Sequence, residues 1–212
     1  MQEEFLPLFP LSLVVFPGET LRLHIFEARY KQLIGECLDT RLTFGIPAVV
    51  DQQLSMVATE VEVVRVDKTY PDGELDITTR GKDKVQIHEF YKVSPNKLYP
   101  GGQISRIGEQ MDQNLRLQQE VYFLIQRLHD ALGYHKEIQR GYHTLRAYEV
   151  GHHVGLNLRQ EVELLGLHSE TERLQFIREH IEHILPVVVE TERLKARARL
   201  NGHFKNLVPP EF

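Results

Sequence analysis

The amino-acid sequence predicts an α+β protein, in which a β-rich N-terminal half precedes a helical C-terminal half. Two observations support this prediction. Up to about residue 107 the apolar runs are short and are interrupted by prolines and glycines, and each proline removes an amide donor and favours extended geometry before it. From about residue 112 apolar residues recur at intervals of three and four, which is typical of amphipathic helices. We therefore expect two domains, over residues 1–108 and 109–212.

The N-terminal segment is expected to be extended and then to form one helix. Its prolines are spaced too closely for a long helix. The predicted elements are an extended segment over 5–11, strands over 13–16 and 20–25, and a turn at Pro17-Gly18 between the two strands. A helix is predicted over Glu27–Leu38, because Glu27 would lie at the positive end of the helix dipole. The apolar residues that follow at helical spacing are Tyr30, Leu33, Ile34, Cys37 and Leu38.

The remaining strands of this half are predicted at 42–50, 56–66, 75–80, 84–91 and 98–107. Gly45 and Pro47 indicate that the first of these is an edge or bulged strand. Pro71-Asp72-Gly73 has turn chemistry, so that 56–80 is a hairpin, and Gly81 is expected to bend the chain into the next strand. Several short strands with one inserted helix fit a small closed or half-closed β-barrel.

The C-terminal half is predicted to contain four helices and a basic helical stretch. The first carries its apolar pattern from Leu117 to Leu132 and ends at Gly133. A polar connection over 133–143 leads to a second helix over 145–154. Asn157 can cap a short third helix through Leu165. The pair Ser169 and Glu172 has the spacing of a capping box and begins the fourth helix. Its apolar stripe is Leu174, Ile177, Ile181, Ile184 and Leu185. Pro186 is expected to break or kink that helix before the basic stretch Glu192–Leu200.

Composition narrows the classes of function. The 212 residues are 42% hydrophobic and 26% charged, which suits one or two globular domains. A formal net charge of -5 argues against a dedicated nucleic-acid binder. The single cysteine, Cys37, excludes an internal disulfide and a multi-cysteine zinc site, and is interpreted as a small buried residue. The N-terminus lacks a basic signal-peptide region and a membrane-spanning apolar run, so we expect a cytoplasmic protein without membrane association.

No enzymatic or metal site is predicted. The histidine pairs His152-His153 and His180/His183 are interpreted as surface or hydrogen-bonded core residues, because a zinc site needs three or four ligands. The serines lie in no G-x-S-x-G context, and Ser169 is interpreted as a helix cap. We assign no catalytic, cofactor-binding or metal-binding residue and expect no cofactor.

A cluster of cations near the C-terminus is the remaining candidate for an acidic partner. It consists of Arg193, Lys195, Arg197, Arg199 and Lys205. Glu190 and Glu192 flank it and aromatic residues are not interleaved with it, so we interpret it as a solvated helix face. Nucleic-acid binding is therefore the less favoured interpretation.

Four motifs occur in order along the chain: LPLFPL, VVFPGETLRLHIFEARY, LYPGGQISRI and GLNLRQEVELLGLHSETERLQFIREHI. They resemble the Lon N-terminal domain, or LON substrate-binding domain, and the form with IFEARY resembles stand-alone members that lack the ATPase and protease domains. The resemblance implies an N-terminal PUA-like β pseudo-barrel with one inserted helix, followed by a C-terminal α-helical bundle. In RGKDKVQIHEF, Lys84 stands where the family more often has arginine, which would still present a long cation.

The resemblance implies a binding role. No G-x-x-x-x-G-K-[ST] phosphate loop is present in the sequence. We expect a non-enzymatic, ATP-independent polypeptide-binding module, adaptor or chaperone-like, with unfolded or extended polypeptides as partners and a protease or chaperone as a further partner. Strand edges can accept an extended polypeptide, and an inter-domain groove is a second candidate site. The alternatives are a PUA-like RNA-binding protein and an unassigned small-molecule or hydrolase activity in that groove. We interpret Leu6–Phe16 and Tyr99–Gly102 as residues that specify the barrel, and the substrate-binding residues and oligomeric state are left unassigned.

Overall fold

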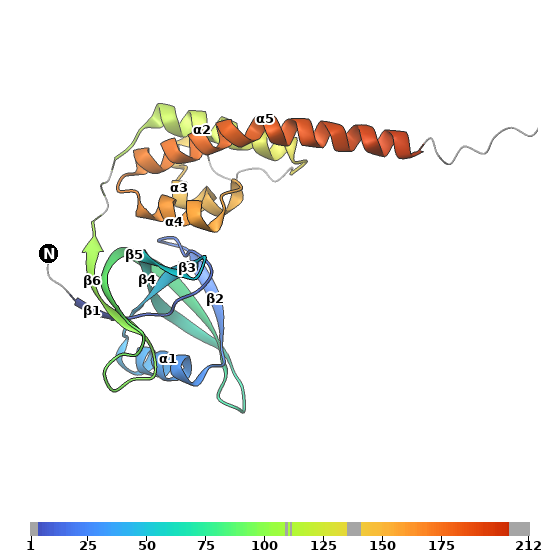
Figure 1. Ribbon diagram of the computed structural model, residues 1–212. Helices are drawn as coiled ribbons and strands as arrows, with labels where there is room; N and C mark the ends of the chain where they lie inside the picture. Colours follow the sequence, from blue (N-terminus) through green and yellow to red (C-terminus); the bar gives the residue numbers. More distant parts are fainter. Residues whose placement is uncertain (1–3, 109, 111, 135–140, 204–212) are drawn as a thin grey trace, which may run out of the picture. The chain divides into compact units, whose positions relative to one another are not determined.

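The computed structural model describes residues 4–108, 110, 112–134 and 141–203. Its fold is α+β, as predicted: an antiparallel sheet with one helix, then helices that include a long last one (Figure 1). Contacts within the chain divide it into two units, which are residues 1–111 with 155–169, and residues 112–154 with 170–212. The domain boundary at residue 108 stays a prediction, and these contacts add the segment 155–169 to the first unit.

Six antiparallel strands build the first unit. They are β1 (Glu4–Pro7), β2 (Thr20–Ile25), β3 (Phe44–Val50), β4 (Gln53–Thr69), β5 (Leu75–Tyr91) and β6 (Gly101–Ile107). The order is β1-β6-β5-β4-β3, and β2 pairs with β5. Within the described residues these strands form no closed barrel. Two isolated parallel bridges, Leu8 to Gly45 and Leu11 to Ala48, connect the segment after β1 to β3.

The predicted strand over 13–16 is wrong. Val14, Val15 and Phe16 are buried in irregular chain. Their backbone groups bond to side chains: Phe16 N donates to Glu19 Oε2 at 2.8 Å, and the Thr59 hydroxyl donates to Val15 O. A segment can therefore be apolar and extended without a strand partner when side chains satisfy its backbone. The turn at Pro17-Gly18 is confirmed.

The strands predicted over 75–80 and 84–91 are not separate, because β5 continues through Gly81. A register shift against β4 lies directly beside this glycine, between the pairs Val61–Gly81 and Thr59–Lys84. Gly81 N donates to Glu19 O at 2.8 Å, and Gly18 N donates to Gly81 O at 3.0 Å. A Cβ atom at Gly81 would overlap the carbonyl oxygen of Phe16. The glycine is therefore required for the close approach of these two segments.

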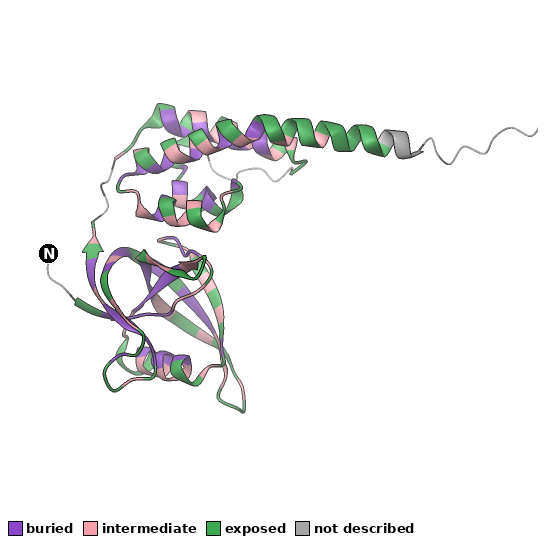
Figure 2. Ribbon diagram, viewed as in Figure 1, coloured by how far each residue is buried: buried purple, intermediate pink, exposed green. Residues whose placement is uncertain are grey.

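Helix α1 (Ala28–Thr40) contributes one face to the core of the first unit (Figure 2). The predicted residues Tyr30, Leu33, Ile34 and Cys37 are buried, and they join a cluster that includes residues of β2, β3, β4 and β5. Leu38 was expected on this face, but its side chain is exposed. It lies in the last turn of α1, at the margin of the buried stripe.

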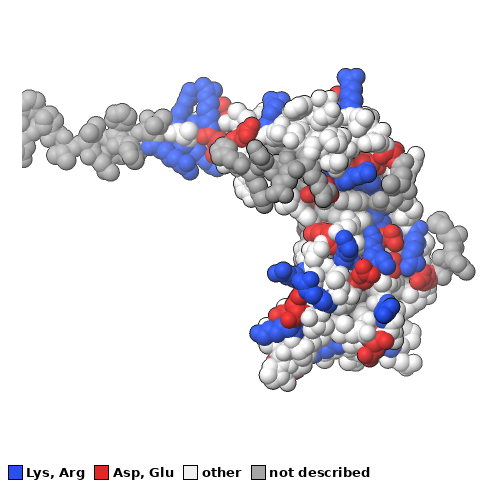
Figure 3. Space-filling model, turned by 180° about the vertical axis from the view of Figure 1, so that it is seen from behind, with Lys and Arg blue, Asp and Glu red and all other residues white. Residues whose placement is uncertain are grey.

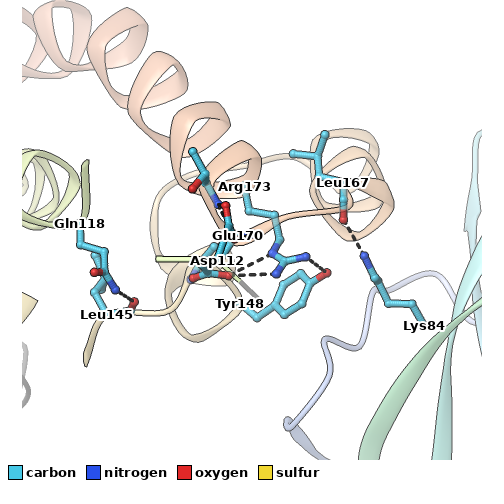
Figure 4. A network of polar contacts seen from close by, with 10 residues as sticks. Lys84, Asp112, Gln118, Leu145, Tyr148, Leu167, Glu170 and Arg173 are labelled. Atoms are coloured by element: carbon cyan, nitrogen blue, oxygen red, sulfur yellow. Dashed lines mark hydrogen bonds and ion pairs between the residues drawn. The ribbon is translucent and has the colours of Figure 1, made fainter. Parts of the chain in front are cut away.

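Helix α4 (Leu158–Gly166) belongs to the first unit. The Asn157 cap is confirmed: Gln160 N donates to Asn157 Oδ1 and Asn157 N donates to Gln160 Oε1, each at 3.0 Å. Lys84 of β5 is fully buried, and its Nζ donates to Leu167 O at 2.5 Å, directly after the end of α4 (Figure 4). A cation is favourable at a helix C-terminus, so this lysine joins α4 to the sheet.

The second unit consists of α2 (Leu115–Ala131), α3 (Ala147–Val150), α5 (Glu170–His203) and the 3₁₀ turns Tyr142–Thr144 and Gly151–His153. Gly133 follows α2 with φ +69, as predicted. The helix predicted over 145–154 is only α3 and a 3₁₀ turn. Pro186 does not end α5, and the separate basic helix predicted after it is part of α5. Of the polar connection, residues 135–140 lie outside the described residues.

A buried polar cluster anchors the start of α5 (Figure 4). The Asp112 carboxylate accepts hydrogen bonds from Glu170 N and Thr171 N. A hydrogen bond with the Thr171 side chain is the largest cause of a lowered Asp112 pKa, and the two backbone bonds lower it further. Glu170 Oε1 accepts from Ala147 N at 2.7 Å, and its Oε2 lies 3.1 Å from the Arg173 guanidinium. The Ser169–Glu172 capping box stays a prediction.

Candidate functional site

Strand β2 lies at a margin of the sheet (Figure 1). Its six residues pair with β5 without a register shift, from Thr20 opposite Arg80 to Ile25 opposite Leu75. No second strand among residues 4–108 pairs with β2. Such an edge offers a row of backbone N–H and C=O groups to another polypeptide.

The pairing register between β2 and β5 identifies which backbone N–H and C=O groups of β2 point away from β5. Gly81 N donates to Glu19 O, so Glu19 occupies a hydrogen-bonded position of the ladder. Hydrogen-bonded and non-hydrogen-bonded positions alternate in an antiparallel pair. The N–H and C=O groups of Thr20, Arg22 and His24 are therefore directed away from β5. The side chains of these three residues are exposed, whereas Leu21 and Leu23 pack half-buried against the core.

The other strand margins differ from β2. The part of β4 that pairs with residues 75–80 has register shifts at Val63/Arg65 and Val66/Lys68. Bulges of this kind protect an edge against further pairing. The bridges of Leu8 and Leu11 occupy part of β3, and β1, at the other end of the strand path, pairs with β6 over only four residues. Strand β2, with six residues in register, is thus the longest of these margins without a register shift.

A cavity of about 460 Å³ lies against β2 in the first unit. Its walls come from β2, β4 and β5, and are formed by Arg22, Leu23, His24, Asp67, Asp76 and Ile77. The outward row of the edge strand and the cavity therefore share Arg22 and His24. A ligand held at this edge would meet both backbone groups and charged side chains.

His24 is held between two carboxylates. Its Nδ1 lies 2.7 Å from Asp76 Oδ1, and its Nε2 lies 3.1 Å from Glu74 Oε2. The hydrogen bond with Asp76 is the largest cause of a raised His24 pKa. The same bond, followed by one from the Tyr70 hydroxyl, lowers the pKa of Asp76. The pair joins β2 to β5 on the exposed face of the sheet.

Arg22 differs from the other charged residues of the cavity in its hydrogen bonding. Asp67 accepts hydrogen bonds from the Thr78 hydroxyl and from Arg65 Nε, and these bonds lower its pKa. No described residue forms a hydrogen bond or an ion pair with Arg22, which acts on Asp67 only through space. The carboxylates that line the cavity already have donors, while the Arg22 guanidinium keeps its donors available.

The cysteine and the histidine pairs from the sequence analysis lie on different elements: α1, the 3₁₀ turn Gly151–His153, and α5. Cys37 is buried, and burial raises its pKa to about 12, so the thiol is protonated at neutral pH. His152 and His153 are exposed, and His180 Nε2 lies 3.2 Å from Val154 O. In the part of the chain that the structure describes, no group of three or more His, Cys, Asp or Glu residues could hold a metal ion. Nor is any helix there long and apolar enough to cross a membrane.

The basic cluster lies on the exposed second half of α5 (Figure 3). Arg193 Nη1 lies 3.6 Å from Glu190 Oε2, and Lys195 Nζ lies 2.7 Å from Glu192 Oε1. Lys205 lies outside the described residues.

A second cavity of about 450 Å³ opens between α2 and the middle of α5. Its walls are formed by Leu124, Arg127, Glu182, Leu185, Pro186, Val189 and Glu190.

Sequence reasoning missed Arg22 and His24 as site residues. The signal was the alternation T-L-R-L-H-I in β2, which places the polar side chains on one face. That pattern alone does not reveal that β2 is paired on one side. Leu6, Leu8, Phe9 and Tyr99, from the two motif-rich segments, are buried in the sheet, where they pack rather than face solvent.

The combination of this sheet, its helix and the C-terminal helices is the fold of Lon N-terminal domains. The crystal structure of a Lon N-terminal domain protein from Xanthomonas campestris is similar, with 27% identity and a TM-score of 0.63, over 81% of this chain and 95% of that chain. The N-terminal domain of a Mycobacterium avium complex Lon protease has the same fold, with 16% identity and a TM-score of 0.66, over 84% of this chain and 98% of that one.

The model of the ATP-dependent protease La (LON) substrate-binding domain matches residues 5–183. The chain therefore belongs to the LON substrate-binding domain family. No curated protein sequence gives a significant match.

Proposed function

We propose that this protein is a non-enzymatic polypeptide-binding module that holds an extended segment of an unfolded partner against β2. The observation that carries the proposal is the one-sided, regular pairing of β2 with β5. Family membership supports a polypeptide as the general class of partner. An adaptor or chaperone-like role, with a protease or chaperone as a further partner, follows from this activity. In this proposal the sheet is the PUA-like pseudo-barrel, half-closed by the bridges of Leu8 and Leu11.

The mode of binding is strand addition. The outward amide groups of Thr20, Arg22 and His24 would pair with the main chain of the partner. Main-chain hydrogen bonds are independent of side-chain identity, so one edge can accept many sequences. This tolerance suits a protein whose partners share an unfolded state rather than a motif.

The cavity lining supports binding rather than catalysis. It contains one histidine and two carboxylates that already bond to each other or to neighbouring side chains, and no serine, threonine or cysteine is part of it. A covalent mechanism needs a nucleophile beside its base. Polypeptide binding requires only the edge and the adjoining surface.

Fluorescence anisotropy with a labelled unfolded polypeptide tests the proposal, with a structured RNA as competitor. Saturable binding that survives moderate salt is expected. The Arg22→Pro variant should bind more weakly than Arg22→Thr, because both lack the cation but only proline lacks the outward N–H. Circular dichroism checks that both variants fold. Equal binding by the two variants, or the absence of saturable binding, would overturn the proposal. Binding to RNA alone, with a steep loss as salt increases, would instead favour the RNA-binding alternative.

A further inference from the structure

We infer that the segment bound at β2 carries an acidic side chain opposite Arg22, between two apolar residues. This inference rests on the proposed function and specifies the class of segment that the edge prefers. The pattern is apolar-acidic-apolar, in extended conformation.

The acidic preference follows from the state of the charged groups in the cavity. Asp76 bonds to His24 and Tyr70, and Asp67 bonds to Thr78 and Arg65. A cationic ligand would have to compete with these donors for the same carboxylate oxygens. An anionic ligand would meet Arg22, which has no hydrogen bond to break with any residue that the structure describes. A carboxylate and a guanidinium can form two parallel hydrogen bonds.

The apolar positions follow from the alternation of side chains along a strand. A residue opposite Arg22 points to the exposed face of the sheet, so its two neighbours in the added strand point to the other face. On that face β2 presents Leu21 and Leu23, which are half-buried at the margin of the core. Apolar neighbours would extend this margin and bury more of both leucines.

The expected preference is modest, because Arg22 is exposed. Cross-strand and surface ion pairs are worth little individually, so a glutamate peptide should bind about threefold to tenfold more tightly than a lysine peptide. The difference should shrink as salt increases, since exposed charges are screened.

Three otherwise identical peptides, with Val-Glu-Val, Val-Gln-Val or Val-Lys-Val at the centre, test the inference by anisotropy. The unsubstituted protein should prefer glutamate over glutamine over lysine. The Arg22→Glu variant should reverse this order. Arg116→Glu is the matched control: it makes the same change in net charge on α2, where the side chain is 90% exposed, and should keep the original order.

The outcomes separate the two proposals. If the unfolded polypeptide binds and the three peptides bind equally, the acidic preference is overturned while polypeptide binding stands. The same conclusion follows if Arg22→Glu and Arg116→Glu change the order alike, since the effect would then be one of net charge. If the unfolded polypeptide itself does not bind, the proposed function fails, and the inference fails with it.

Discussion

Replacing Arg173 by methionine should destabilise the protein by about 3–5 kcal/mol, the cost typical of breaking a buried ion pair from one side. Arg173 is 2% exposed and Glu170 is 5% exposed. The guanidinium lies 3.1 Å from Glu170 Oε2, donates to the Tyr148 hydroxyl at 3.2 Å, and lies 4.4 Å from the centre of the Tyr148 ring. Methionine retains much of the aliphatic volume but leaves the Glu170 carboxylate in the interior without this cation. Because folded domains are stable by about 5–15 kcal/mol, the loss should be obvious.

The assay is urea unfolding followed by far-UV circular dichroism, with the free energy taken from linear extrapolation. Arg116→Met is the matched control, because it breaks an ion pair at the surface. Arg116 Nε lies 3.0 Å from Glu120 Oε1, and the Arg116 side chain is 90% exposed. Such surface pairs contribute about 1 kcal/mol or less. Adding Glu170→Gln to Arg173→Met should recover part of the loss by removing the buried charge. If Arg173→Met costs no more than Arg116→Met, the reasoning from burial is refuted.

Three further predictions concern the first unit. Asp76→Asn should lower the His24 pKa, as measured by NMR titration. The His24–Asp76 bond raises the His24 pKa in the folded protein, so it stabilises the fold fully below the ordinary pKa of 6.5. This contribution is lost as the pH rises through the raised pKa of the folded protein. Gly81→Ala should cost roughly 1–3 kcal/mol in urea unfolding, because its Cβ would overlap the Phe16 carbonyl oxygen. Cys37 should resist a thiol-alkylating reagent in the folded protein and react after unfolding, as followed by mass spectrometry, because it is buried with a pKa of about 12.

For each of these three predictions, a specific result would contradict the reasoning. A His24 pKa that is unchanged in Asp76→Asn would exclude the carboxylate as its cause. Gly35→Ala serves as the control for Gly81→Ala, because a Cβ at Gly35 meets open space in α1, so that this change should stabilise the helix by about 0.5–1 kcal/mol. If both glycine variants are equally stable, the close approach at Gly81 is not tight. Alkylation of Cys37 at the same rate with and without urea would contradict its burial.

The sequence predicted those helices and helix ends that are determined by residues close to one another along the chain. The spacing of Tyr30, Leu33, Ile34 and Cys37 identified a helix and its buried face, because that face is decided by the helical period. Asn157 and Gly133 marked helix ends, because a cap needs only neighbouring residues. The break considered at Pro186 does not occur, because α5 continues to His203. Proline weakens an isolated helix, whereas most helical stability in a protein comes from tertiary packing.

The candidate site was beyond the reach of the sequence, because it depends on pairing between distant residues. The alternating sequence of β2 predicts a half-buried strand, and the family resemblance indicates a polypeptide as partner. Only the folded chain decides that β5 lies on one side of β2 and no described strand on the other. It also decides that Arg22 lies near Asp67 without a hydrogen bond or ion pair to any described residue. In the same way only tertiary contact explains Lys84, whose partner Leu167 lies 83 residues away along the chain. Local propensity is encoded within a few residues, whereas strand edges and buried charges are properties of the whole sheet and its neighbours.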